Sequence, residues 1–145
     1  MKINVKKLNE NAKLPMYATT RSAGGDLYAL LDENVTIKQG ETKIIKTGLA
    51  FAIPEGYMGL VYARSGLSVK EGLAPANKVG VIDADYRGEL MVALYNQSSS
   101  DKIVKNGDRI AQFIIAPYIK ADYEIVEDLD ETTRGEGGFG STGTN

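Results

Sequence analysis

All five arginines of this chain lie close to a glycine, a pairing that suits the binding of phosphate. Glycine lets a ligand approach the backbone, and the rigid guanidinium fork takes two phosphate oxygens. One arginine beside a turn is most often an ordinary surface residue, but the same pairing at every arginine favours an anionic ligand. The five are Arg21, Arg64, Arg87, Arg109 and Arg134.

The sequence contains no histidine and no cysteine. It therefore has no thiol nucleophile, histidine base, disulfide or zinc site of the usual type. Any catalysis then depends on carboxylates and on a hard metal ion held by oxygen. The best-placed carboxylates are Asp26, which follows two glycines, and Asp83, which lies in an acidic turn. Taken alone, each is most often a simple turn residue.

The last twelve residues, 134–145, contain five of the sixteen glycines. Their N–H groups can converge on an anion, Ser141 and Thr142 add hydroxyl donors, and Phe139 can cover a flat group. The spelling G-x-G-x-x-G occurs here, but only five residues follow Gly140, whereas a dinucleotide fold needs a helix and an acidic residue about 20 positions further on. The tail also has no lysine for a Walker loop. A glycine-rich end is also typical of a disordered terminus, so a phosphate-binding arm and a frayed end both remain open.

Composition fits one globular domain of 145 residues, with 43% hydrophobic and 25% charged residues. A net charge of −2 without a basic run argues against a nucleic-acid polymer as partner. No apolar stretch approaches the roughly 18 residues of a membrane span, and the N-terminus has no apolar signal core. We therefore expect a cytoplasmic protein without a membrane segment.

Apolar residues alternate with a period of two, most clearly over residues 45–53, which predicts a strand there. Only Leu67–Gly72 has room for a short helix. The run Val79–Ile82, an acidic turn and the alternating residues 89–95 predict a hairpin. Short strands between Gly, Asn, Asp and Pro turns favour an all-β sandwich or barrel, with a jelly roll the natural candidate. Further strands are predicted at 1–8, 34–38, 57–63, 109–119 and 123–126.

Five turn-like segments follow one another along the chain, and together they carry most of the candidate residues. In order and separation they closely resemble the five motifs of the homotrimeric dUTP pyrophosphatases (dUTPases). Each motif alone is weak, but all five in a cysteine-free, β-rich chain of this length are very specific. Ala63 stands where many relatives have proline, which is a neutral change. The segments are 23–29, 64–67, 80–88, 107–112 and the tail 134–143.

The resemblance implies an all-β, distorted jelly-roll subunit (the dUTPase-like β-clip) over residues 1–133, with one short helix. It implies a flexible C-terminal arm, residues 134–145, that closes over the active site. The family forms a homotrimer with shared active sites and hydrolyses dUTP to dUMP and pyrophosphate with Mg²⁺. That reaction keeps uracil out of DNA and supplies dUMP for thymidylate synthesis.

The resemblance also assigns roles to single residues. Asp83 is the catalytic base that activates water for attack on the α-phosphorus, and Asn77 helps to hold that water. Tyr86 lies under the sugar, where a ribose 2′-hydroxyl would clash, and Asp26 meets Mg²⁺ through water. The other residues implied to bind substrate are Arg64, Ser65, Gly66, Gly80, Val81, Ile82, Gln112 and, on the arm, Arg134 at the distal phosphate, Phe139 over the uracil, Gly140, Ser141 and Thr142.

Two other functions fit parts of this pattern. A dCTP deaminase shares the fold but uses a glutamate base on the pyrimidine ring and lacks this arm sequence. A non-catalytic jelly roll, either a nucleotide-binding regulator or a structural module, fits the composition equally well but has no need of Asp26, Ser65 and Asp83. For Asp108 and Arg109, a structural ion pair at a turn and a contact with substrate both remain open.

Overall fold

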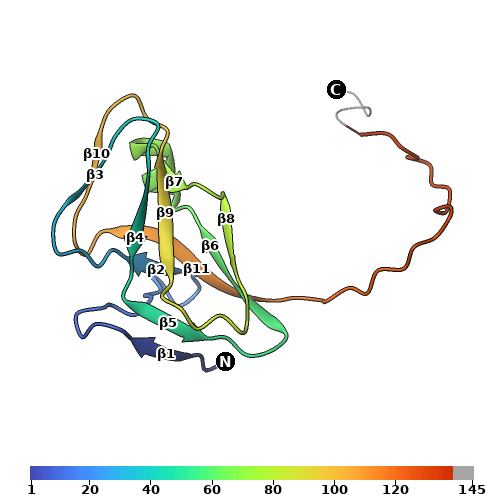
Figure 1. The fold of residues 1–145 in the computed structure, drawn as a ribbon, viewed down its shortest axis with the longest axis horizontal. Helices are drawn as coiled ribbons and strands as arrows, with labels where there is room; N and C mark the ends of the chain where they lie inside the picture. Colours follow the sequence, from blue (N-terminus) through green and yellow to red (C-terminus); the bar gives the residue numbers. More distant parts are fainter. Residues whose placement is uncertain (139–145) are drawn as a thin grey trace.

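Short alternating segments become eleven strands and one short π-helix in the computed structural model, which describes residues 1–138 (Figure 1). The predicted helix at 67–72 is confirmed as η1 (Leu67–Glu71). Within the described residues no helix has the length and apolar character needed to cross a membrane. The strands are β1 (Asn4–Lys7), β2 (Gly25–Tyr28), β3 (Val35–Ile37), β4 (Thr42–Lys46), β5 (Leu49–Ala52), β6 (Tyr57–Tyr62), β7 (Leu73–Pro75), β8 (Val79–Ile82), β9 (Met91–Asn96), β10 (Lys102–Val104) and β11 (Arg109–Pro117).

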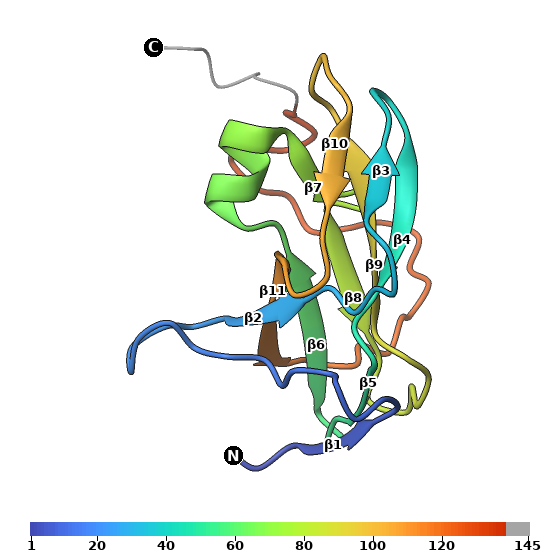
Figure 2. The same ribbon diagram turned by 90° about the vertical axis from the view of Figure 1, so that its left-hand side faces the viewer.

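The strands pair antiparallel, in four small sheets over the part of the chain that the structure describes. The larger sheets have the orders β2-β11-β6-β8 and β4-β9-β7. The pair β1-β5 lies at one end of the body, and the pair β3-β10 lies at the other (Figure 2). One core joins the sheets, because fully buried residues of different strands pack into one cluster that includes Leu27, Ile45, Leu49 and Leu94. The all-β prediction is confirmed.

The predicted single strand over residues 45–53 is wrong, because the chain bends at Gly48. Its φ of +70° is a conformation that a side chain disfavours, and it separates β4 from β5. After the bend the chain changes partner, since β4 pairs with β9 whereas β5 pairs with β1. Alternation showed that both halves bury one face, but it carried no signal for the change of sheet.

The predicted hairpin is also wrong, although both of its strands exist. Strand β8 pairs with β6, whereas β9 pairs with β4 and β7. The acidic turn between them therefore crosses from one sheet to the other. Strand pairing depends on partners far along the chain, and the local turn signal could not indicate them.

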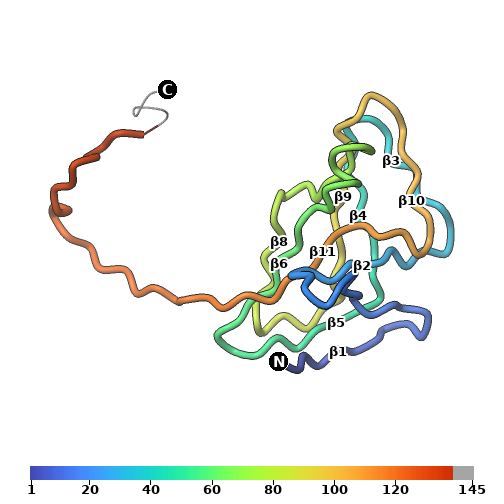
Figure 3. Tube along the Cα trace, turned by 180° about the vertical axis from the view of Figure 1, so that it is seen from behind, coloured from blue at the N-terminus to red at the C-terminus, as the bar shows by residue number. Residues whose placement is uncertain are grey.

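The stretch after β11 leaves the body and runs away from it (Figure 3). The strand predicted at 123–126 is wrong, since residues 118–138 form neither strand nor helix. A strand needs a partner for its backbone and for one face, and this stretch meets neither within its own chain. Four of its apolar residues are almost fully exposed, at 94% for Ile119, 95% for Tyr123, 100% for Ile125 and 84% for Leu129.

Gly59, in the middle of β6, leaves room for an aromatic ring of the core. A Cβ at this position would lie 2.5 Å from Phe113 Cε2 and 3.0 Å from Ile53 Cδ1. The Phe113 ring cannot simply move away, because its centroid is 4.9 Å from that of Phe51. We expect Gly59→Ala to lower the free energy of unfolding by about 2 kcal/mol through overpacking.

Urea denaturation at a fixed protein concentration measures this effect. Gly66→Ala is the matched control, since Gly66 has φ −64° and a Cβ there meets nothing within 4 Å. The control is expected to be neutral or up to about 1 kcal/mol more stable. Equal stability of both variants would contradict the prediction.

Candidate active site

Five of the predicted site residues line one pocket of about 320 Å³. Three strands build it. Gln112 of β11 stands opposite Asp26 of β2 on one side and opposite Tyr62 of β6 on the other. The turn that follows β6 then brings in its own residues. The five are Asp26, Arg64, Ser65, Gly66 and Gln112.

The Gln112 side chain is fixed against the end of β6. Its Nε2 donates a hydrogen bond to the Ala63 carbonyl at 2.8 Å. Its Oε1 would lie 3.0 Å from a Cβ at Gly24, so the glycine there lets the amide pack against the backbone. The glycine of the first motif thus helps to position a residue of the fourth.

Asp26 is held by two arginines. Arg64 Nε donates to Asp26 Oδ1 at 2.7 Å, and Arg109 Nη1 donates to Asp26 Oδ2 at 3.2 Å. The Asp26 side chain is only 15% exposed, so solvent screens these ion pairs less than pairs on an open surface. Two cations against one carboxylate leave the pocket with an excess positive charge, which favours an anion.

The geometry excludes one of the two interpretations of Asp108 and Arg109, the ion pair between them. Among the described residues these two form no ion pair with each other. Asp108 Oδ2 instead accepts the Lys105 backbone N–H at 2.8 Å and holds the turn before β11. Arg109 therefore lines the pocket and pairs with Asp26, whereas Asp108 bonds within its own turn. A contact of either residue with substrate stays a prediction.

The donor set of this pocket fits a hydrated Mg²⁺. Over residues 1–138 no group of three or more acidic, histidine or cysteine residues could hold a metal by itself. A single carboxylate suits Mg²⁺, which keeps much of its water and takes phosphate oxygens. Each Asp26 oxygen accepts one arginine N–H and retains a second lone pair for a metal-bound water.

A second cluster surrounds the turn between β8 and β9. The Tyr86 N–H donates to the Asp83 carbonyl at 3.2 Å. Arg87 Nη1 donates to the carbonyls of Ala84 at 2.6 Å and of Tyr86 at 2.9 Å, so the guanidinium holds the turn from outside. A pocket of about 210 Å³ lies between the turn and β9, lined in part by Val81, Ile82, Asp83 and Tyr86.

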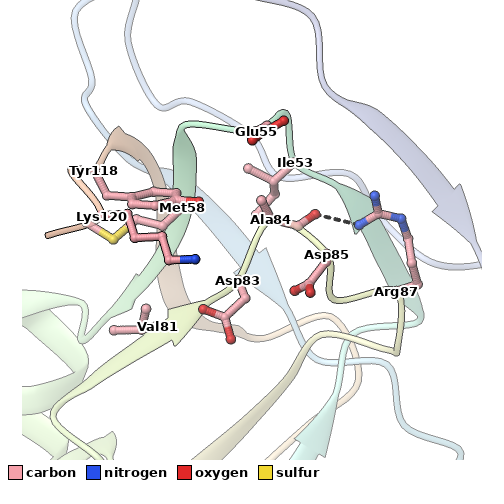
Figure 4. A pocket seen from close by; sticks show the side chains of 10 residues that line it. All are labelled: Ile53, Glu55, Met58, Val81, Asp83, Ala84, Asp85, Arg87, Tyr118 and Lys120. Carbon is pink, nitrogen blue, oxygen red and sulfur yellow. Dashed lines mark hydrogen bonds between the residues drawn. The ribbon is translucent and has the colours of Figure 1, made fainter. Parts of the chain in front are cut away.

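Asp83 also lines a larger cavity of about 710 Å³ on the other side of the turn (Figure 4). There its carboxylate and that of Asp85 lie on the turn, while Tyr118 and Lys120 come from the stretch after β11. Asp83 is exposed and borders both hollows. It can therefore reach a water molecule and a ligand at once, as a general base must.

The two clusters line different pockets, so a single chain does not bring all the predicted residues together. Asn77 is exposed in the turn before β8, with its Nδ2 3.3 Å from the position of a Cβ at Gly80. Arg134 lies on the outgoing stretch, where its Nε donates to the Gly137 carbonyl at 2.8 Å. The remaining predicted residues, Phe139, Gly140, Ser141 and Thr142, lie outside the described residues.

Both clusters fall within one family match. The model of the dUTPase family matches residues 10–143. This chain belongs to the dUTPase family. The match includes all five motif segments and both pockets.

Relatives of known name support the dUTPase assignment over the whole chain. The deoxyuridine 5'-triphosphate nucleotidohydrolase of Syntrophotalea carbinolica is 52% identical over 141 residues, which cover 97% of this chain and 96% of the relative. A dUTPase variant of Staphylococcus bacteriophage 80alpha, solved with dUpNHpp, has a TM-score of 0.89 and 31% identity, with 98% of each chain covered. A dUTPase variant from phage phi11 of S. aureus, solved with a structural Mg(II) ion, has a TM-score of 0.81 and 29% identity, with 90% of this chain and all of the other covered. The predicted jelly-roll-like fold of the dUTPases is confirmed.

Sequence reasoning missed one member of this dUTPase site. Glu89 lines the pocket beside Tyr86, and its Oε1 accepts the Gly48 N–H at 2.8 Å. The two residues are separated by 41 positions, and no periodicity links them. Only the change of sheet at Gly48 brings them together.

Proposed function

We propose that this chain hydrolyses dUTP to dUMP and pyrophosphate by in-line attack of water on the α-phosphorus. The observation that carries the proposal is the pair of clusters within one family match. One cluster presents two arginines around a carboxylate, and the other presents the exposed Asp83 carboxylate on a turn. Phosphate binding and general base catalysis are the two needs of such a hydrolysis.

Asp83 takes the proton from the attacking water in this mechanism, and Asn77 orients that water. Val81 and Ile82, with Gly80, supply the edge of β8 that takes the uracil and sugar, and Tyr86 excludes a ribose 2′-hydroxyl. Backbone groups at such an edge read a base by fixed geometry, which favours uracil over cytosine.

The triphosphate binds in the 320 Å³ pocket beside Asp26, where its contacts are Arg64, Ser65, Gly66 and Gln112. Asp26 holds Mg²⁺ through water. Bound Mg²⁺ would orient the triphosphate and neutralise the leaving pyrophosphate. The role of Asp26 is supported by the hydrated-ion character of the donor set and by its fixed position between two guanidinium groups.

In this proposal the all-β domain covers residues 1–133, and the arm, residues 134–145, closes over bound nucleotide. Arg134 binds the distal phosphate, Phe139 covers the uracil, and Gly140, Ser141 and Thr142 donate to phosphate. Glycine-rich backbone with flanking hydroxyls is suited to wrapping an anion. The free nucleotide substrate makes the cytoplasm the place of action, without a membrane or nucleic-acid polymer as partner.

The working form is a homotrimer with shared active sites. The two clusters occupy different pockets of one chain, whereas one dUTP must touch both. The outgoing stretch offers apolar side chains such as Ile125, fully exposed, that burial against another copy would stabilise. Both observations favour a site completed by neighbouring subunits.

A panel of dUTP, dCTP, dTTP and UTP with Mg²⁺ tests the activity. We expect pyrophosphate release from dUTP at a kcat/KM at least about 100-fold above the others. Backbone groups that fit uracil remain unpaired with cytosine, a closed pocket leaves little room for the thymine methyl, and Tyr86 excludes the ribose of UTP. Ammonia release from dCTP would instead indicate a deaminase. If no nucleotide were turned over, the result would favour a non-catalytic jelly-roll protein.

A further inference from the structure

The Tyr86 ring rests on the backbone of Gly88. A Cβ at Gly88 would lie 2.6 Å from Tyr86 Cζ and 2.9 Å from its Cε2, so any side chain there would displace the ring. The Tyr86 hydroxyl donates a hydrogen bond to the Glu89 carbonyl at 3.0 Å. The Tyr86 ring is thus held on one side by contact with Gly88 and at its hydroxyl by the Glu89 carbonyl.

Glu89 is in turn anchored to the bend between β4 and β5. Its Oε1 accepts the Gly48 N–H at 2.8 Å, in a partly buried place where a charge-assisted hydrogen bond is strong. Gly48 has a φ of +70°, and this bend aims its N–H at the carboxylate. The contact crosses from the β4–β5 junction to the end of the Asp83 turn.

Backbone hydrogen bonds hold the neighbouring residue independently of the Glu89 side chain. The Leu90 N–H donates to the Leu49 carbonyl at 2.7 Å, and the buried Thr47 hydroxyl donates to the Leu90 carbonyl. Strand β9 therefore keeps its place without the Glu89 carboxylate. Without that carboxylate, residues 86–89 would lose the side-chain contact that ties them to the bend between β4 and β5.

We infer that Glu89 is a positioning residue that sets the place of the Tyr86 ring and thereby the discrimination between deoxyribose and ribose. The inference rests on the proposed function, in which Tyr86 excludes the 2′-hydroxyl. The Glu89 carbonyl that accepts the Tyr86 hydroxyl shares its peptide unit with the Leu90 N–H, which the Leu49 carbonyl holds. The Glu89 carboxylate adds a second fixed point to the same residue through the Gly48 N–H. Selectivity depends on the position of a rigid wall, so a loosened ring admits the larger sugar.

The test compares kcat/KM for dUTP and for UTP, with Mg²⁺, in Glu89→Ala. We expect the ratio of dUTP to UTP to fall about tenfold, a cost typical of one lost positioning contact. Glu89→Gln keeps an amide oxygen for the Gly48 N–H and is expected to retain the ratio within about threefold. A ratio unchanged in Glu89→Ala, or lost equally in Glu89→Gln, would overturn the inference.

Tyr86→Phe supplies a second test that leaves the Glu89 anchor intact. Loss of the hydroxyl alone is expected to lower the ratio by a similar factor. The double variant Glu89→Ala/Tyr86→Phe should then be no less selective than either single one, because both remove the same restraint. Effects that multiply would overturn the inference, as would an unchanged ratio in Tyr86→Phe.

The same measurements separate this inference from the proposed function. If the wild-type chain hydrolysed UTP as fast as dUTP, the role of Tyr86 would fail and this inference with it. If the wild type is selective and Glu89→Ala is equally selective, only the inference fails.

Discussion

Asp83→Asn is expected to lower kcat for dUTP about a thousandfold, with KM little changed. The amide has nearly the shape of the carboxylate but cannot take a proton from the attacking water. Because Asp83 lies exposed on the turn, outside the core, the substitution should not affect folding. Steady-state pyrophosphate release measures the loss, and a thermal unfolding curve checks the fold.

Asp85→Asn provides the matched control. Asp85 lies on the same turn, is equally exposed and lines only the larger of the two hollows beside it. Its kcat is expected within about twofold of the wild type. Near-normal turnover in Asp83→Asn, or an equal loss in both variants, would refute Asp83 as the base.

Removal of residues 134–145 is expected to lower kcat/KM for dUTP by about 100-fold. A closing segment excludes water and adds donors to the phosphates, contributions that mutagenesis places at about 10²-fold or more. The body should fold normally, since β11 already ends at Pro117. A chain shortened only by residues 144–145 keeps every proposed arm donor and should be almost fully active.

Mixing the two impaired variants tests whether the sites are shared. Asp83→Asn carries an intact arm, and the chain cut before Arg134 carries an intact Asp83. If the arm of one subunit closes over the Asp83 turn of another, trimers assembled from both variants regain part of the activity. No recovery after confirmed mixed assembly would argue that each arm closes over its own turn.

The cluster of Asp26, Arg64 and Arg109 shows what local sequence patterns can and cannot predict. Glycines beside arginines predicted that Arg64 lies at a ligand site, and Arg64 lines the 320 Å³ pocket. They could not indicate that Asp26 lies between Arg64 and Arg109, because that arrangement comes from the pairing of β2 and β6 with β11. Arg109 could only be left undecided, since sequence proximity to Asp108 suggested the wrong partner.

The turn that carries Asp83 shows the same limit, since local patterns did not predict which strands pair. Its acidic and aromatic residues were predicted correctly as a turn, yet the strands around it were predicted to pair with each other. In the structure they belong to separate sheets, and Glu89 reaches back to Gly48 across 41 positions. In our inference, the sugar selectivity at Tyr86 depends on Glu89, a residue that no local pattern indicated.

The sequence by itself determined the chemistry available to this protein and its membership of the dUTPase family. Without histidine or cysteine, a general base is most simply a carboxylate, and the order of five motifs predicted which carboxylates to examine. Tertiary structure alone decided which strands pair, which two cations meet Asp26, and that the two predicted clusters line separate pockets. The physical reason is that periodicity reports which face of a strand is buried, whereas partners are chosen by packing between distant segments.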